Sequence, residues 1–281
     1  IKGLDRNDYA NSTFEGYGER QDFFDLLGYY NPYYLSEIQP SSSDQVMLNE
    51  NAYINLSPIK GLNVRSALGL QWYDYRYSQK ALPVGPFEGA GTAIEDFQRY
   101  YNWTITNTAE YKFDFLDDHY VTILLGQESM SNKDQSFRAR AEGLTDPRLL
   151  LMSAAATGVK PTHSIAEEVR NSWFGTLNYS YAEKYFVDLS IRRDGSSLFG
   201  ENNRWATFGA AAAMWKISRE KFMEGTKSWL NNLDLKASYG TTGISGIGAY
   251  LALGLVGTGP LYDGNSGSAI ANPSNPDLSW E

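Results

Sequence analysis

The stretch Tyr101–Phe113, YNWTITNTAEYKF, decides the fold class, because its apolar and polar residues alternate one by one. Six of the seven residues at odd positions are apolar or aromatic, whereas all six residues at even positions are polar. A period of two places these sets on opposite faces of a β-strand, and a helix would mix them. The stretch therefore predicts a long strand with one apolar face and one polar face.

The same alternation recurs along the chain and predicts an all-β, antiparallel protein of about eight strands. Two phenylalanines, Phe174 and Phe186, interrupt it. Many of the alternating stretches span 9 to 13 residues. A tilted membrane-spanning strand has about 9–11 residues, and a typical globular strand about 5–6. The further clear stretches are 62–71, 172–181, 185–192 and 233–239, and the weaker ones are 48–56, 120–131 and 204–216.

The connections between these strands alternate between short and long, as they do in outer-membrane β-barrels with short periplasmic turns and long extracellular loops. The short connections are 57–61, 116–119 and 182–184, and the long ones are 79–95, 132–168 and 194–203. The connection 217–232 is long in a short-turn position, and we expect a brief helix there with Ser218 as its N-cap. Aromatic residues gather near strand ends, which is typical of the two interfacial girdles of a barrel.

Composition excludes several classes of function. The chain has 281 residues and a net charge of −9, which argues against a nucleic-acid-binding protein. It has no cysteine and only two histidines, His119 and His163, so we expect no metal site and no cofactor. No apolar run approaches the roughly 18 residues of a membrane helix.

No catalytic constellation is visible either, and we expect no enzyme activity. Asp117 and Asp118 are adjacent carboxylates, but they fit a solvated turn better than an acid/base pair, which needs two groups converging across a cleft. Asp194 lies near Ser196 and Ser197, yet neither histidine is close in sequence to complete a triad. Catalytic, cofactor-binding and metal-binding residues are therefore all predicted to be none.

Three regions are expected along the chain. Residues 1–45 and 244–281 alternate poorly and are rich in turn residues, so we interpret 1–45 as a long extracellular loop region. Residues 46–243 hold the barrel strands and their loops, and residues 244–281 form an extracellular loop leading to a truncated strand. The chain starts without Met and ends on Leu278-Ser279-Trp280-Glu281, which is typical of a strand entry. We therefore expect an internal piece of a longer protein.

Several segments in order resemble the barrel of SusC/RagA-like TonB-dependent outer-membrane transporters. Arg193–Gly200 (RDGSSLFG) and Asn203-Arg204-Trp205 are followed by Phe208, Trp215 and Glu220-Lys221-Phe222. The remaining segments are Leu235–Gly243 (LKASYGTTG), Asn275–Glu281 (NPDLSWE), and His119-Tyr120 with Leu125–Glu128 (LGQE). The specific match covers roughly Asn171–Gly243 and the last seven residues.

This resemblance implies a barrel of 22 strands with an N-terminal plug, of which the present strands would be about a third. The parent protein would lie in the outer membrane of a Gram-negative, Bacteroidetes-like cell, in contact with outer-membrane lipids. It would import oligosaccharides or peptides with a SusD-like surface lipoprotein, driven by the TonB complex. The plug and the segment that contacts TonB lie outside this chain.

Two other readings stay open from the residues. Eight strands could close into a small outer-membrane barrel with a structural or adhesive role. The chain could also be a secreted, soluble β-sandwich that binds glycans, or an enzyme built on one, and such a protein would have to hide its apolar strand faces.

The shared motif itself is expected to build structure rather than bind a substrate. Asp194–Ser197 can form a sharp turn, with Gly195 at a positive φ. Phe199 and Trp205 would then pack at the rim where two strands leave the membrane. If sugars bind, stacking aromatics are the natural candidates, although packing roles suit each of them better and substrate-binding residues stay unassigned. These candidates are Tyr73, Tyr75, Tyr77, Phe87 and Tyr250.

Overall fold

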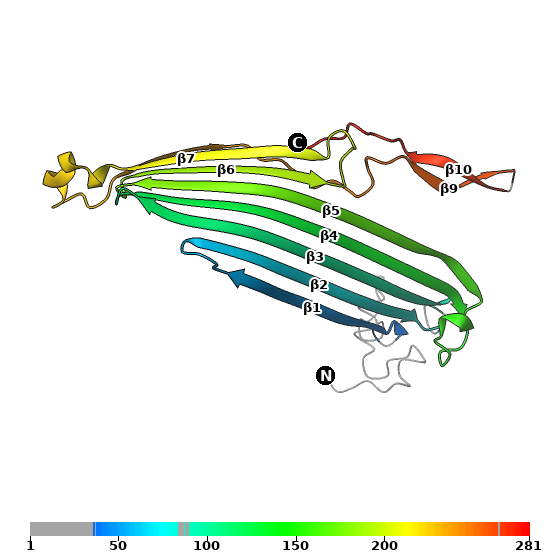
Figure 1. Ribbon diagram of the computed structural model, residues 1–281. Helices are drawn as coiled ribbons and strands as arrows, with labels where there is room; N and C mark the ends of the chain where they lie inside the picture. Colours follow the sequence, from blue (N-terminus) through cyan, green and yellow to red (C-terminus); the bar gives the residue numbers. More distant parts are fainter. Residues whose placement is uncertain (1–35, 37, 84–86, 88–89, 264) are drawn as a thin grey trace, which may run out of the picture. The chain divides into compact units, whose positions relative to one another are not determined.

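The computed structural model describes residues 36, 38–83, 87, 90–263 and 265–281. Eight strands form a single antiparallel sheet in which each strand pairs with its neighbours in sequence (Figure 1). The strands are β1 (Ser41–Leu56), β2 (Leu62–Ala81), β3 (Gly91–Phe115), β4 (His119–Leu144), β5 (Thr157–Tyr181), β6 (Tyr185–Ser196), β7 (Trp205–Lys216) and β8 (Asp234–Gly240). Among the described residues, β1 and β8 do not pair with each other, so these strands do not close a small barrel.

A single sheet also differs from the soluble sandwich that the sequence left open, because a sandwich needs two sheets packed face to face. A second, two-stranded sheet among the described residues is a hairpin of β9 (Leu255–Tyr262) and β10 (Asn265–Asn272). In the described part of the chain, no helix has the length and hydropathy needed to cross a membrane.

The chain divides into two compact units. One contains residues 1–48, 72–100 and 134–165, and the other contains residues 49–71, 101–133 and 166–281. The second unit holds the short turns, the halves of β1–β5 next to them, and β6 to β10.

The register of the sheet sorts side chains by polarity. Along β5 to β8, Tyr181 is opposite Tyr185, Tyr185 is opposite Trp215, and Trp215 is opposite Leu235. Three residues further along the strands, a row on the opposite face contains Asn178, Asp188, Ala212 and Ser238. Because side chains alternate between faces, the two rows define an apolar face and a polar face of the sheet.

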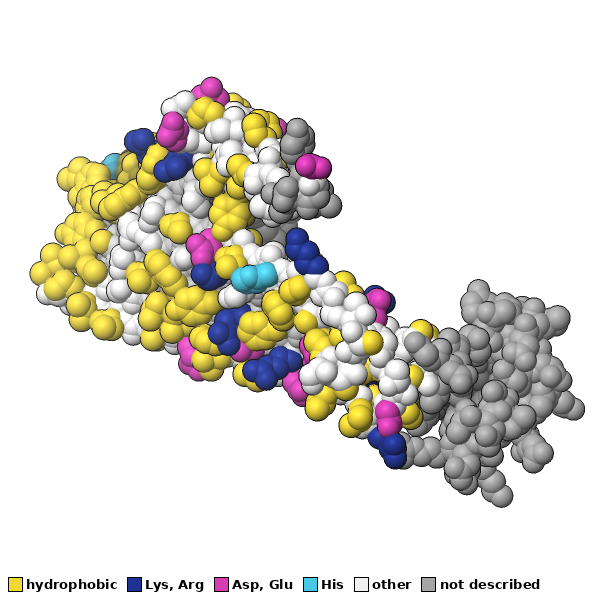
Figure 2. All heavy atoms as spheres, turned by 90° about the vertical axis from the view of Figure 1, so that its right-hand side faces the viewer, with side chains coloured by type: hydrophobic (Ala, Val, Ile, Leu, Met, Phe, Trp, Pro, Cys, Tyr) yellow, Lys and Arg dark blue, Asp and Glu magenta, His cyan; other side chains and the backbone are white. Residues whose placement is uncertain are grey.

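The apolar face is uncovered. Trp173 is 61% exposed, Ile191 60% and Leu235 60%, and exposed hydrophobic side chains are widespread in the view of Figure 2. Few large side chains are fully buried among the described residues; Phe199 and Leu144 are examples. A soluble monomer rarely exposes apolar patches larger than a few hundred Å², so this sheet needs an apolar environment on one side.

Stacked aromatic rings form a belt on the apolar face at the end with the short turns. His119 stacks between Phe115 and Tyr181, with ring centroids 4.7 and 4.6 Å away. Tyr181 stacks on Tyr185 at 6.0 Å, and Tyr185 on Trp215 at 6.3 Å. His119 is the first residue of β4 rather than part of the turn, and its Nδ1 lies 2.8 Å from the Tyr179 hydroxyl. This belt is the girdle expected at one membrane interface.

The two interruptions of the alternation have local causes. Phe174 lies on the polar face and covers Gly126, where an added Cβ would come within 2.2 Å of the Phe174 ring. An aromatic ring over a strand glycine fills the space that a side chain would otherwise occupy. Phe186 also faces the polar side, where the Lys216 ammonium lies 4.8 Å from its ring centroid.

The strands are much longer than the expected 9 to 13 residues. β4 has 26 residues and β5 has 25, and together they take up most of the expected loop 132–168. The expectation was wrong because both faces carry polar residues in this region, so the amphipathic period that marks a strand is weak. Polar pairs join them across the strands instead. Ser136 Oγ lies 2.7 Å from Ser164 Oγ, and Gln135 Nε2 lies 3.1 Å from His163 Nε2.

The expected turn at Asp194–Ser197 was also wrong. Asp194 and Gly195 pair with β5 on one side and β7 on the other, and β6 continues to Ser196. Gly195 is not among the residues with positive φ. A glycine is needed at this position because an added Cβ would lie 2.9 Å from the Trp205 ring. The chain turns after it, in residues 197–204.

The connection between β7 and β8 contains two 3₁₀ segments, η3 (Ile217–Arg219) and η4 (Lys221–Thr226). Ser218 caps neither of them, so the expected N-cap was wrong. The residues at the cap positions are Lys216 and Glu220, and neither makes a side-chain capping hydrogen bond. The Ser218 hydroxyl donates instead to Asn232 Oδ1 at 3.3 Å.

The expected region boundaries also shift. β1 begins at Ser41, a few residues before the expected start at 46, and residues 244–281 contain the β9–β10 hairpin where a loop leading to a truncated strand was expected. Most of the expected loop region 1–45, namely residues 1–35 and 37, lies outside the described residues.

Candidate functional site: a cavity on the polar face

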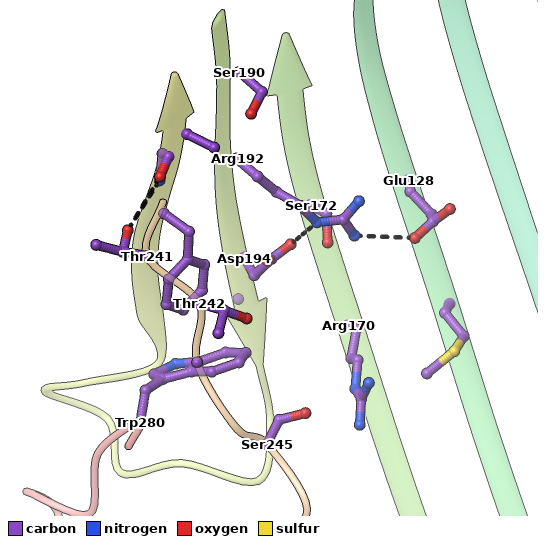
Figure 3. Close-up of a pocket in the computed structure, with 16 residues that line it drawn as sticks. Glu128, Arg170, Ser172, Ser190, Arg192, Asp194, Thr241, Thr242, Ser245 and Trp280 are labelled. Atoms are coloured by element: carbon purple, nitrogen blue, oxygen red, sulfur yellow. Dashed lines mark hydrogen bonds and ion pairs between the residues drawn. The ribbon is translucent and has the colours of Figure 1, made fainter. Parts of the chain in front are cut away.

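The polar face carries a cavity of about 460 Å³ within the second unit. Strands β4 to β7 form its floor, and residues 241–245 and Trp280 border it on one side (Figure 3). Its polar lining comprises Glu128, Arg170, Ser172, Ser190, Arg192, Asp194, Thr241, Thr242 and Ser245.

Arg192 is the centre of an ion-pair network. Its Nε donates to Asp194 Oδ1 at 2.6 Å, and one terminal nitrogen donates to Glu128 Oε1 at 3.2 Å (Figure 3). Thr106 donates to the other Glu128 oxygen at 3.1 Å. The guanidinium carbon also lies 5.3 Å from the Phe174 ring centroid. Because Glu128 and Asp194 lie on different strands, Arg192 ties β4 to β6 across β5.

A second pair borders the same cavity. Arg170 pairs with Glu168 two residues earlier on β5, and Glu168 accepts a further hydrogen bond from Asn132 at 3.4 Å. Ser172, next on this face, is 4% exposed. The cavity therefore offers guanidinium, carboxylate and hydroxyl groups at fixed positions. Such a lining suits a polar solute or another polar protein surface.

The C-terminal segment is attached beside this cavity. Trp280 packs against Phe199 at 4.5 Å and edge-on against Phe208 at 5.7 Å between ring centroids. Backbone hydrogen bonds join Gly200 N to Leu278 O at 3.0 Å and Asn202 N to Pro276 O at 3.2 Å. Asn202 Nδ2 donates to Asp277 Oδ1 at 2.8 Å. Two of the segments that carry the family resemblance are thus in contact with each other.

Phe199 does pack tightly, as expected, but against Trp280 rather than at a rim with Trp205. It is 2% exposed, whereas Trp205 is 45% exposed on the apolar face beside the Arg193 guanidinium. Gly200 has no room for a side chain, since a Cβ would lie 2.0 Å from Pro276 O.

The aromatic candidates for sugar binding do not form one cluster. Tyr73 and Tyr75 stack at 6.4 Å between centroids and belong to the first unit, as does Tyr77. Phe87 lies in the connection between β2 and β3. Tyr250 belongs to the second unit, where its hydroxyl accepts a hydrogen bond from Glu167 N at 3.1 Å. A role for these residues in substrate binding stays a prediction.

The side chains considered for metal or acid/base chemistry have other partners in the residues that the structure describes. No group of three or more His, Asp or Glu could hold a metal ion there. Asp194 accepts a hydrogen bond from Arg192 in the second unit, and His163 forms a hydrogen bond with Gln135 in the first unit. Asp117 lies in a tight turn with φ of 61°.

Glu128, Arg170 and Arg192 were not predicted from the sequence to form a cluster. The signal was present, because each lies at an even position, opposite the apolar set of its own strand. What the sequence could not supply was the register that brings positions 128 and 192 together.

Comparison with known proteins agrees with this geometry. A sheet with one uncovered apolar face, an aromatic belt and charged groups on the other face defines a segment of a membrane β-barrel wall. The family model described as "TonB dependent receptor-like, beta-barrel" matches residues 2–281. The chain therefore belongs to the TonB-dependent receptor β-barrel family.

Similar proteins include the TonB-dependent receptor P39 of Formosa agariphila, with 31% identity over 89% of this chain and 24% of that protein. The TonB-dependent receptor SusC of Bacteroides thetaiotaomicron is 38% identical over 39% of this chain and 12% of that protein. Among solved structures, the RagAB peptide transporter matches with a TM-score of 0.83 and 34% identity, over 90% of this chain and 29% of that chain.

The chain spans about a quarter of the length of the curated relatives that it matches over most of its own length. The fold class expected from the sequence, an antiparallel transmembrane barrel segment of the SusC/RagA type, is confirmed.

Proposed function

We propose that this chain is part of the barrel wall of an outer-membrane, TonB-dependent nutrient importer. The observation that carries the proposal is the match of the whole sheet to the family, together with its two-faced structure. The apolar face would contact outer-membrane lipids, and the polar face with its cavity would line the interior. The long connections would lie outside the cell and the short turns in the periplasm.

The imported substrate would be an oligosaccharide or a peptide, handled with a SusD-like lipoprotein and driven by the TonB complex. The similarity to SusC and to the RagAB peptide transporter supports this class of system. Charged and hydroxyl groups on the polar face are compatible with either solute, because both present many hydrogen-bonding groups.

The test is an uptake assay on the full-length parent protein in its native cell. We expect the protein in the outer-membrane fraction and co-purification of a lipoprotein encoded nearby. Deletion of the gene should abolish uptake of one labelled class, oligosaccharides or peptides, and leave the other unchanged. Dissipating the proton-motive force should have the same effect as deletion. Normal uptake of both classes in the deletion strain, across a broad panel, would contradict the import proposal.

A further inference from the structure

An apolar groove of about 550 Å³ crosses the apolar face within the second unit. It exists because small residues lie between larger ones. Gly175 is flanked by Leu125, whose Cδ2 would lie 3.2 Å from an added Cβ, and by Ile191, its partner in the β5–β6 register. Val64 and Ala109 continue the groove toward β2.

Polar groups border the groove on one side. Ser66 donates to Asn107 Oδ1 at 2.8 Å, and Asn107 donates to Gln127 Oε1 at 3.0 Å. Asn107 and Gln127 line the groove together with Arg193. The apolar floor therefore ends at a band of amides and one cation.

Arg193 is exposed on this apolar face and belongs to the groove lining. Its register partners are Trp173 on β5 and Thr207 on β7, and its guanidinium lies 5.5 Å from the Trp205 ring centroid. Within the described residues it has no carboxylate within 4 Å, whereas its neighbour Arg192 on the other face has two. Among the described residues, Arg193 is thus a positive charge without a carboxylate partner at the end of an apolar groove.

The position of Arg193 fits a membrane interface. Trp205 and Trp215 are the ends of an apolar stretch of β7, and Trp215 belongs to the aromatic belt beside the short turns. The two residues are ~33 Å apart along the strand at ~3.3 Å per residue, or ~25 Å across a membrane for a tilt of ~40°. That distance matches the apolar band of a membrane barrel, so Trp205 and Arg193 lie at the second interface.

We propose that this groove binds an anionic membrane lipid, with an acyl chain on the floor formed by Val64, Ala109, Leu125 and Gly175 and the headgroup phosphate on Arg193. Charge complementarity selects this occupant, because an unpaired guanidinium at lipid-headgroup depth attracts phosphate and gives planar, two-point hydrogen bonding. The inference uses only the membrane position of the barrel wall and is independent of what the parent protein imports.

The test is native mass spectrometry of the full-length parent protein after reconstitution in an equimolar mixture of phosphatidylglycerol and phosphatidylcholine with identical acyl chains. Wild-type protein should retain phosphatidylglycerol in preference. R193Q should reduce the ratio of retained phosphatidylglycerol to phosphatidylcholine about fivefold, the effect expected of one cation near an anionic headgroup. The matched control is R65Q, because Arg65 also has no carboxylate within 4 Å among the described residues and lies over the Tyr53 ring, 4.2 Å from its centroid.

A second variant tests the groove itself. A109L should fill the floor and lower retention of both lipids, whereas A213L, on the same face outside the groove, should not. Equal lipid ratios for wild type and R193Q, or equal losses in A109L and A213L, would overturn the proposal. R193K keeps the charge and should retain part of the preference, which distinguishes lost charge from lost folding. Normal uptake by R193Q would leave the import proposal intact.

Discussion

At the scale of single residues, Glu220 shows how the short-turn end is held together. Its carboxylate accepts hydrogen bonds from the Tyr185 hydroxyl at 2.6 Å, the Lys184 ammonium at 3.0 Å and the Trp215 indole at 3.1 Å. These donors, with Tyr185 contributing most, lower the pKa of Glu220 from 4.5 to about 2. Glu220, which lies in the connection between β7 and β8, thus links the β5–β6 turn to the aromatic belt.

The lowered pKa predicts a pH dependence of stability. A carboxyl group whose pKa is lower in the folded state stabilises the fold above its unfolded pKa, and this stabilisation is lost as the pH falls through the folded pKa. We therefore expect wild type to be more stable than E220Q above about pH 5, and the difference to vanish between pH 4.5 and about 2. Thermal unfolding midpoints of the full-length protein in detergent measure this. A difference that does not change with pH would contradict the account.

Gly126 provides a second test at this scale. Replacing it with Ala would place a Cβ 2.2 Å from the Phe174 ring, so the ring must move and the Arg192 guanidinium beside it loses its support. We expect G126A to destabilise the protein by about 1–3 kcal/mol, as overpacking generally does.

The matched control is G158A, since an added Cβ at Gly158 has no neighbour within 4 Å. Both variants can be compared by unfolding of the full-length protein in denaturant. Equal stability of G126A and G158A would show that Phe174 does not depend on the space above Gly126.

At the scale of elements, residues 197–204 contact the C-terminal segment. This contact explains why two motifs that are far apart in the sequence occur together in the family. The two regions exchange backbone hydrogen bonds, and Trp280 connects Phe199 to Phe208 on β7. The indole nitrogen also donates to Arg204 O at 3.3 Å.

We expect W280A to loosen this connection by about 1–3 kcal/mol, because two aromatic pairs and one hydrogen bond are lost. Limited proteolysis of the full-length protein should then cut within residues 197–204 faster than in wild type. W229A is the control, because Trp229 is 73% exposed in the connection between β7 and β8. If residues 197–204 are cut equally slowly in W280A and W229A, contacts other than those of Trp280 hold this segment, and the prediction is wrong.

The strands themselves show how far sequence reasoning reaches. Where one face is apolar, as in Tyr101–Phe113 and Tyr185–Arg192, the period of two located the strand and its faces. Where both faces carry polar residues, as in the distal halves of β4 and β5, the alternation has little contrast, and these strand segments were interpreted as a loop. Polar cross-strand pairs such as Ser136–Ser164 stabilise these parts, and they depend on a register that the sequence does not encode locally.

The cavity on the polar face could not be predicted from the sequence for a related reason. Its members come from β4, β5, β6, β7 and the segments near Thr241 and Trp280, so only the sheet order and register bring them together. Phe174 was recorded as an exception to the alternation, and the structure explains it through Gly126, which is 48 positions earlier by the residue numbers. The exception to the alternation at Phe174 therefore marks a contact between β5 and β4.

At the scale of the whole molecule, the sheet is one portion of a barrel wall. Its uncovered apolar face, its aromatic belt and its ion-paired polar face are three aspects of one arrangement, in which lipid lies on one side and polar solvent or protein on the other. The family match and the TM-score of 0.83 place the same strands in receptors and transporters several times longer than this chain.

The most direct measurement of this arrangement is a scan of β6 with spin labels in the full-length protein. Because this segment has no cysteine, single cysteines can be introduced at Val187, Leu189 and Ile191 and at Asp188 and Ser190 after removing any cysteine elsewhere in the parent. In lipid bilayers, we predict that labels at 187, 189 and 191 collide preferentially with oxygen, which concentrates in lipid. Labels at 188 and 190 should collide preferentially with a water-soluble nickel complex. Equal access of the nickel complex to both sets would contradict the assignment of this sheet to a membrane barrel wall.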